Sequence, residues 1–398
     1  ATEHVVQKYL SYLETTFGFS DKSLNDQFLR ELRQPDKFAK GPILEATPPF
    51  ETSCSIEDLI QEGVLSGEFR KLKAPDLPVD RPLYLHQEQA VRKVVSGRNI
   101  IVATGTGSGK TETFLIPILN YLFRQKEQGR LGPGVRALLL YPMNALANDQ
   151  LKRLRKLLRN YPEITFGSYT GETKHGKDEA LEHFYQMYPG ETKLSNELLS
   201  REAMKESPPH ILLTNYAMLE YLLLRPADNV FFDGIYAGEW RFIVLDEAHT
   251  YSGAKGIEMA MLLRRLKDRV VASRPGALQC IATSATLGGD AGDYRQVTNF
   301  GVGLFSENFE RVADDESRQD VIIGRRKELI VAEASWGIPP GELYLSWAKI
   351  MQEASAKLSD LYAEGKKYGV PDAVLQEAKG LGDCKKFLYT VLAGDARL

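Results

Sequence analysis

The sequence has little cysteine, no long apolar run and no strong charge of either sign. Its three cysteines, Cys54, Cys280 and Cys384, lie too far apart along the chain for a zinc knuckle or a Cys-x-x-Cys pair. Three cysteines cannot all pair within one chain, which favours a reducing compartment. No stretch approaches the roughly 18 continuous apolar residues of a membrane span, and the first ten residues lack a secretory pattern. We therefore expect a cytoplasmic protein.

Charge and composition further limit the class of protein that this sequence can form. The formal net charge of −3 argues against a wholly basic nucleic-acid coat, although local basic patches are still compatible with it. There is no internal repeat and no low-complexity tract. The histidines at positions 86, 175, 183 and 210 lack metal-like spacing, so we expect surface or core histidines. With 398 residues, of which 43% are hydrophobic, the chain predicts two domains, or one domain with a large appendage.

Short apolar runs alternate with longer amphipathic segments between residues 84 and 287. Continuous apolar runs of this length are typical of strands that are buried on both faces of a parallel sheet. We expect such strands at residues 99–103, 135–141, 164–169, 210–214, 241–246 and 278–283. The sequence therefore predicts a three-layer α/β domain.

The pattern of apolar and polar residues changes on both sides of this domain. The linker-like stretch KAPDLPVDRP spans residues 73–82, at the end of residues 1–75, for which we expect a mainly helical accessory region. We place the α/β domain at 76–290, with a polar surface insertion at about 174–200. Residues 291–398 are expected to form a connector and a helical appendage, because apolar residues recur at three- and four-residue spacing over 343–369.

The stretch VATGTGSGKTETF, residues 102–114, follows one predicted strand and opens a predicted helix. Its glycines let the backbone turn tightly, so that successive N–H groups and the helix N-terminus converge on an anion. Lys110 would then reach the β- and γ-phosphates of a nucleotide, and Thr111 would hold Mg²⁺. The strict pattern has glycine where this chain has Thr104, so the loop by itself leaves open an ordinary glycine-rich turn. The other residues expected to bind the nucleotide are Thr106, Gly107, Ser108, Gly109 and Glu112.

A second signal lies in RFIVLDEAHTY, where an apolar run ends in Asp246 and Glu247. A carboxylate at the carboxyl end of a parallel strand is placed to face the phosphate loop across the sheet. Asp246 would bind Mg²⁺ through water, and Glu247 would act as general base on the attacking water. Without Lys110, the same pair would be read as charge at a helix N-terminus. The two elements together predict an ATPase-type core.

With TGTGSGKT followed by DEAH, the chain resembles the superfamily 2 helicases, whose motor domains are RecA-like. LHQEQA resembles the adenine-reading element of that family, which implies adenine contact by Gln87. TSAT resembles motif III, in which Ser284 and Thr286 would couple His249 of the DEAH box to nucleic-acid binding. The sequences LLTNYAMLE and VLDEAHTYSGAKG are similar to those of the MrfA/YprA-like bacterial DNA helicases and of large phage-defence helicases of the DISARM type. The resemblance covers about residues 84–290 and implies ATP and Mg²⁺ as cofactors. It implies DNA as partner, either single-stranded or duplex with a single-stranded end, and other defence or repair proteins as further partners.

The same resemblance implies nucleic-acid contacts from three loops. YPMNALANDQ, YTGET and LLTNYAMLE resemble motifs Ia, Ib and Ic, which assign backbone contacts to Asn144, Thr170, Gly171, Thr214 and Asn215. Small donors of this kind position phosphates and do not read bases. For Thr214 and Asn215 a helix N-cap is an equally good interpretation.

One basic segment is a candidate for a further DNA contact. QLKRLRKLLRN, residues 150–160, carries five basic residues and no acidic one, with leucines on its inward side. Charge runs on α/β surfaces are common, so we favour an ordinary solvated helix face over direct DNA contact.

Superfamily 2 motors also use arginines from a second RecA-like domain, and no matching arginine run is found in this sequence. The nearest candidate, QDVIIGRRKEL, has the wrong spacing, so Arg325 and Arg326 are expected to be surface residues. Two function classes follow. The first is the N-terminal, ATP-binding half of a DNA helicase or translocase, in phage defence or DNA repair; the second is an ATP-binding regulatory or nucleic-acid-binding module without turnover.

Overall fold

The computed structural model describes residues 2–34, 48–105, 107–285, 294–312, 315–327, 335–352 and 356–396. The chain divides into two compact units, one of residues 50–327 and one that combines residues 1–49 with 328–398. The first is the α/β unit, and it extends beyond the expected range 76–290 on both sides. On the N-terminal side it includes β1 (Thr52–Ser55), α3 (Ile56–Gln61) and α4 (Phe69–Leu72), because β1 pairs with β2 (Pro82–Tyr84).

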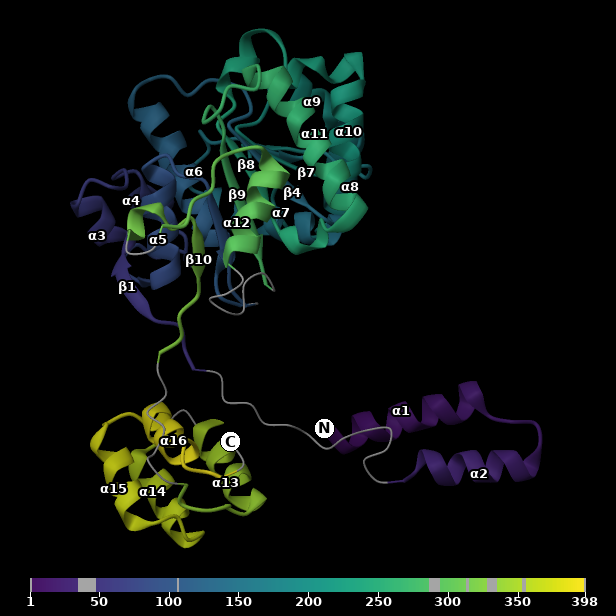
Figure 1. The fold of residues 1–398 in the computed structure, drawn as a ribbon, viewed down its shortest axis with the longest axis vertical. Helices are drawn as coiled ribbons and strands as arrows, with labels where there is room; N and C mark the ends of the chain where they lie inside the picture. The colour runs from purple at the N-terminus through teal and green to yellow at the C-terminus, as the bar shows by residue number, and fades with distance from the viewer. Residues whose placement is uncertain are drawn as a thin grey trace. The chain divides into compact units, whose positions relative to one another are not determined.

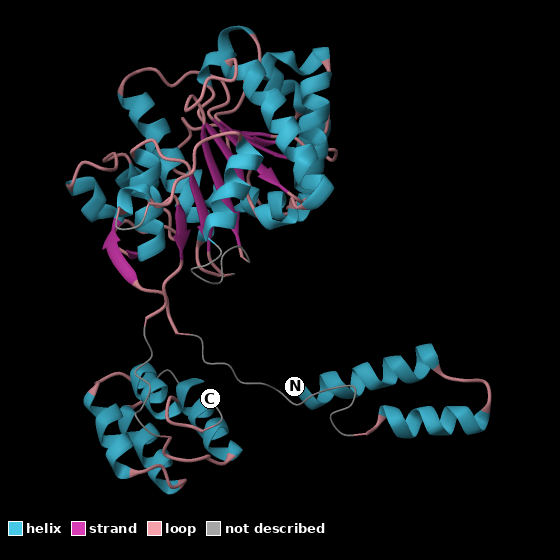
Figure 2. Cartoon of the chain, in the orientation of Figure 1, coloured by secondary structure: helices cyan, strands magenta, loops and turns pink. Residues whose placement is uncertain are grey.

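Within the described residues, the centre of this unit is a sheet of eight strands in the order β10-β3-β9-β8-β4-β7-β5-β6 (Figures 1 and 2). All of its pairings are parallel. The strands are β3 (Ile100–Ala103), β4 (Ala137–Tyr141), β5 (Phe166–Ser168), β6 (Glu197–Leu198), β7 (Ile211–Asn215), β8 (Phe242–Leu245), β9 (Gln279–Ser284) and β10 (Val321–Ile323). The three-layer α/β prediction is confirmed, and β6 and β10 are additional strands that were not predicted.

The two faces of the sheet carry separate hydrophobic cores, because neighbouring residues of a strand point to opposite sides. Leu139 of β4 and Val244 of β8 belong to the first core, and Leu138 and Leu245 belong to the second. The first core contains residues of α5 (Leu85–Val95), α6 (Lys110–Glu127) and α7 (Asn144–Leu158). The second contains residues of α10 (Tyr216–Leu224), α11 (Gly253–Val271) and α12 (Tyr294–Phe305). Burial on both sides explains why the strands are continuously apolar.

The segment 174–200 forms α8 (Lys177–Met187) and β6, and α9 (Arg201–Glu206) follows it. Ala180 and Phe184 of α8 are buried, while most other residues of this helix are half-buried or exposed. Since β6 pairs with β5 and stands last in the strand order, the segment supplies an edge strand of the sheet.

The remaining helices form the predicted helical appendages. At the N-terminal end are α1 (Thr2–Phe17) and α2 (Lys22–Leu32), and the Asp21 side chain caps α2 by accepting from the Leu24 N–H. The C-terminal helices are α13 (Gly341–Gln352), α14 (Leu358–Lys367), α15 (Asp372–Gly380) and α16 (Cys384–Leu392). Trp347 and Phe387 belong to the core that these four share.

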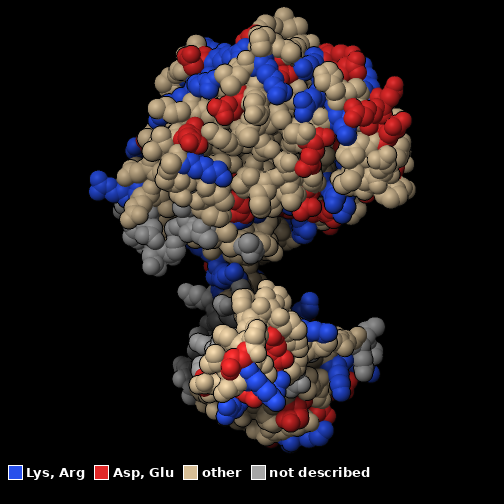
Figure 3. Space-filling view, turned by 90° about the vertical axis from the view of Figure 1, so that its right-hand side faces the viewer, with Lys and Arg blue, Asp and Glu red and all other residues tan. Residues whose placement is uncertain are grey.

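Charges of both signs are spread over the surface. On the face drawn in Figure 3, Lys and Arg side chains stand among Asp and Glu side chains. Within the part of the chain that the structure describes, no helix has both the length and the apolar character needed to span a membrane.

Candidate nucleotide-binding site

The phosphate loop connects β3 to α6. Gly107 has φ +76° and Gly109 has φ +71°, a backbone region that residues with a Cβ rarely adopt. The hydroxyls of Thr104 and Ser108 lie 2.5 Å apart, so the threonine that replaces the expected glycine forms a hydrogen bond across the loop. A loop of this shape directs backbone N–H groups to an anion at the N-terminus of α6. Thr106, also predicted to bind the nucleotide, lies outside the described residues.

Helix α5 supports this loop through two side chains. The Gln87 side chain donates from Nε2 to the Gly109 carbonyl at 2.9 Å and accepts from the Tyr84 N–H at 2.9 Å. His86 is buried, and its Nε2 lies 2.8 Å from the Ser108 carbonyl. Burial lowers the pKa of His86, so the ring is neutral at neutral pH and donates this hydrogen bond. Only a surface or core histidine was predicted at this position; adenine contact by Gln87 stays a prediction.

The two carboxylates follow β8, and the strand order brings them to the loop. Lys110 Nζ donates to Glu247 Oε1 at 3.1 Å, although the two residues come from different strand–loop units. Glu247 has φ +50°, a conformation that is uncommon for a residue other than glycine and that concentrates at functional sites. Asp246 is 9% exposed and accepts from the Thr283 hydroxyl. Burial raises the pKa of the Asp246 carboxyl.

Strand β9 lies between β3 and β8 and ends at Ser284, one of the two residues predicted to couple the nucleotide site to nucleic-acid binding. His249, in the short 3₁₀ turn Ala248–Thr250, has its Nδ1 3.2 Å from Ser284 Oγ and 3.4 Å from Glu247 Oε2. The structure therefore brings the predicted pair His249 and Ser284 together. Thr286 lies outside the described residues. Thr283 was not predicted, although it belongs to the same TSAT stretch.

Helix α7 contributes two further side chains that sequence reasoning missed. Gln150 Nε2 donates to the Thr111 hydroxyl at 3.3 Å, and Arg153 forms an ion pair with Glu112 in the first turn of α6. Arg155, two residues further on, is buried and bound to Glu197 at 2.7 Å. The expectation of a solvated basic face is therefore wrong for Arg155 and only partly right for Arg153, whose side chain is 34% exposed. These partners are distant in sequence, so the pattern of the helix alone could not identify them.

We expect an Arg153→Ala substitution to destabilise the protein by about 1–3 kcal/mol, because the buried Glu112 carboxylate would lose its cation. The free energy of unfolding is measured in urea. Lys156→Ala, on an exposed position of the same helix, is the matched control and should change stability by less than about 0.5 kcal/mol. Equal effects of the two substitutions would contradict the prediction.

Two of the predicted nucleic-acid residues meet at the ends of β4 and β7. Asn215 Nδ2 donates to Asn144 Oδ1 at 2.8 Å, and Asn144 Nδ2 donates to Glu172 Oε1 at 2.9 Å. The Asn215 side chain also accepts from the Met218 N–H at 2.8 Å, so it caps α10 as the alternative interpretation required. Residues from three predicted motifs therefore lie at one edge of the sheet.

The other three predicted contacts differ in exposure. Gly171 is exposed. Thr170 is almost buried, and its hydroxyl accepts from the Glu172 N–H at 3.3 Å. Thr214 is fully buried and donates to the Tyr169 carbonyl at 2.6 Å. The expectation of a phosphate contact therefore does not fit the Thr214 side chain, whose hydroxyl is used inside the domain.

Arg325 and Arg326 are exposed, as predicted. The Arg326 guanidinium stacks on the Phe50 ring, with its carbon 4.5 Å from the ring centroid. A Cβ built on Gly105 would lie 3.9 Å from Arg326 Nη2, so this arginine stands beside the phosphate loop.

The fold and the site define a phosphate-loop ATP-binding domain of the RecA-like class. The chain belongs to the DEAD/DEAH box helicase family, whose model matches residues 84–293. The predicted family is thus confirmed.

Relatives and solved structures are consistent with this family. The chain is 32% identical to Druantia protein DruE of Escherichia coli (strain UMEA 4076-1), over 70% of this chain and 20% of that protein. It is 30% identical to the ATP-dependent helicase YprA of Bacillus subtilis (strain 168), over 57% of this chain and 26% of that protein. The crystal structure of the DUF1998 helicase MrfA bound to DNA matches with a TM-score of 0.50 and 19% identity, over 86% of this chain and 43% of that one, which shows the fold. The chain spans only a minor part of these relatives.

Proposed function

We propose that this chain is the ATP-binding motor part of an ATP-dependent DNA helicase or translocase. The observation that carries the proposal is the 3.1 Å contact between Lys110 Nζ and Glu247 Oε1. A phosphate-binding lysine and a general base must act on the same phosphoryl group, and here they meet although 137 residues separate them in sequence.

The residues around this contact fit ATP and Mg²⁺. The left-handed Gly107 and Gly109 shape an anion cradle, and Lys110 would neutralise the β- and γ-phosphates. The Thr111 hydroxyl and, through water, the Asp246 carboxylate would hold Mg²⁺, since both offer the oxygen donors that this ion prefers. When bound, the ion would neutralise charge on the transferred phosphoryl group. Glu247 would orient the attacking water and take its proton.

Single-stranded DNA is the partner that we propose for the edge formed by Asn144, Gly171 and Asn215. Amide and backbone donors of this type hold phosphates without reading sequence. Support comes from the hydrogen bonds that join Asn144 to Asn215 and to the Glu172 loop. Because charges of both signs cover the visible surface, we expect weak, salt-sensitive binding. A role in phage defence or DNA repair, and a cytoplasmic location, stay predictions.

The second candidate is an ATP-binding regulatory or nucleic-acid-binding module without turnover. The feature that separates it from the first candidate is an arginine supplied to the γ-phosphate, and within residues 1–398 no arginine run like that of a second motor domain occurs. The two candidates share the nucleotide site and differ in hydrolysis.

A Lys110→Ala substitution tests the nucleotide site. We expect affinity for ATP·Mg²⁺ to fall by roughly 30- to 1,000-fold, because losing one partner of a desolvated charge contact costs on the order of 2–4 kcal/mol. Calorimetry on residues 1–398 measures the change. Lys126→Ala, at the other end of the same helix, is the matched control and should bind ATP like the unmodified chain. Unchanged affinity in the Lys110 variant would overturn the assignment.

A further inference from the structure

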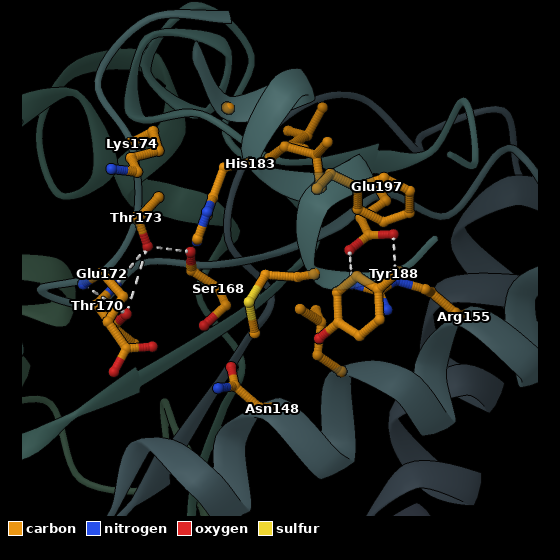
Figure 4. Close-up of a pocket in the computed structure, with 16 residues that line it drawn as sticks. Asn148, Arg155, Ser168, Thr170, Glu172, Thr173, Lys174, His183, Tyr188 and Glu197 are labelled. Carbon is orange, nitrogen blue, oxygen red and sulfur yellow. Dashed lines mark hydrogen bonds and ion pairs between the residues drawn. The ribbon is translucent and has the colours of Figure 1, made fainter. Parts of the chain in front are cut away.

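A cavity of about 110 Å³ lies beside the predicted nucleic-acid edge, and none of the roles proposed above uses it. Asn148 and Arg155 of α7 line one side, and His183 of α8 with Tyr188 at its C-terminal end line another (Figure 4). Ser168, at the end of β5, lies between them. The chemistry of these walls indicates what the cavity holds.

Two polar groups of the walls lack a hydrogen-bond partner among the described residues. Ser168 Oγ is buried and unpaired. The Arg155 guanidinium is bound to Glu197 through Nε and Nη2, at 2.7 and 2.9 Å, while Nη1 makes no hydrogen bond and lies 3.8 Å from the exposed Glu191. Buried polar groups are satisfied in more than roughly 90% of cases, so the unpaired Ser168 hydroxyl, beside an Arg155 Nη1 held only by a longer ion pair, indicates a polar ligand.

The same walls offer flat surfaces. The Tyr188 ring has the Arg155 guanidinium 4.2 Å from its centroid and the Lys152 ammonium at 5.7 Å. Figure 4 shows His183 reaching from α8 toward Ser168, with Asn148 on the opposite side of the cavity. A planar ring with hydrogen-bonding edges matches such walls, because aromatic side chains stack on it while Asn, Ser and His pair with its edge.

The volume and the position of the cavity further limit the kinds of ligand that it can hold. The volume is well below the roughly 300–1,000 Å³ of pockets that hold whole small molecules, so it suits a single ring system. Thr170 and Glu172, in the loop that also carries the exposed Gly171, form part of the lining. A strand whose phosphates lie on that loop would therefore run past the mouth of the cavity.

We propose that this cavity takes one unstacked nucleobase of the single strand that lies on the 170–172 loop. The proposal rests on the proposed function, because it needs the strand on that loop. A base in a single strand costs little to unstack, and stacking on the protein compensates for the loss. The base then holds the strand in register between steps, while its phosphates stay on the loop.

Photocrosslinking tests the proposal on residues 1–398 at low salt. A single 5-iodouracil is placed in turn at each position of a short oligothymidylate, and the crosslinked peptides are identified by mass spectrometry. We expect adducts at His183 or Tyr188. Tyr185, an exposed ring on the same helix outside the cavity, should not react.

Matched substitutions give the second readout. Tyr188→Leu should reduce the crosslink yield, and DNA affinity by roughly tenfold, whereas Tyr185→Leu should change both by less than about twofold. If Tyr188→Leu does not fold, His183→Ala against His175→Ala makes the same comparison, since His175 is exposed outside the cavity.

The outcomes separate the two proposals. DNA binding by anisotropy together with crosslinks only outside the cavity, or with equal effects of the paired substitutions, would overturn the base site and leave the proposed function intact. If the unmodified chain does not bind DNA at all, the DNA-binding part of the proposed function is wrong, and the base site with it.

Discussion

A Glu247→Gln variant is expected to lose ATP hydrolysis by about 10²- to 10⁴-fold while keeping its ATP affinity within about threefold, which is the effect of removing a general base. The amide has the shape of the carboxylate and can still accept from Lys110 Nζ, so the contact that now measures 3.1 Å can persist. It cannot take a proton from water. The variant should therefore separate binding from chemistry.

The measurement is release of phosphate in the presence of single-stranded DNA, made on this chain joined to a second motor domain, with calorimetry for affinity. Glu258→Gln is the matched control, because Glu258 is exposed on α11 and its carboxylate accepts from the Tyr216 hydroxyl at 3.5 Å. It should hydrolyse ATP at the unmodified rate. Undiminished hydrolysis by the Glu247 variant would assign the base to another residue.

Much of the fold follows from local sequence signals. The six predicted strands are continuous apolar runs, and burial on both faces of a parallel sheet requires such runs. Strand β10 has only three residues and depends on pairing with β3, more than 200 residues away in sequence, so no local pattern marks it. The same holds for Phe50, which bridges to Arg326 and brings the N-terminal part of the unit to the sheet.

The residues of the candidate site could also be predicted only in part. Gly107, Gly109 and Lys110 are recognisable because a phosphate loop demands particular backbone angles and one cation. Arg153 could not be recognised, since its role depends on where the α7 helix lies relative to Glu112. The role of a residue can be predicted from its type when the motif that positions it is contiguous in sequence. Contacts between helices that are distant in sequence depend on the packing of the whole domain.

We expect residues 1–398 to bind ATP and to hydrolyse it slowly, on the order of 10³- to 10⁵-fold below the rate of a protein that supplies an arginine to the γ-phosphate, since that is the range for arginine fingers. Lys110 provides one cation, and it is balanced by Glu247 at 3.1 Å. Charge that develops on the phosphoryl group would then be met by Lys110 and Mg²⁺ without an arginine. DNA alone should not restore the rate.

Arg326 provides the sharpest challenge to this prediction, because its guanidinium stands beside Gly105. The assay is phosphate release by residues 1–398, with and without single-stranded DNA, for the unmodified chain and for the Arg325→Ala and Arg326→Ala variants. Slow release in all three would place the missing arginine outside these residues. If the unmodified chain instead turns over robustly with DNA and Arg326→Ala abolishes that turnover, the arginine is supplied in cis. The stacking of Arg326 on Phe50, at 4.5 Å, would then be the contact that holds it ready next to the loop.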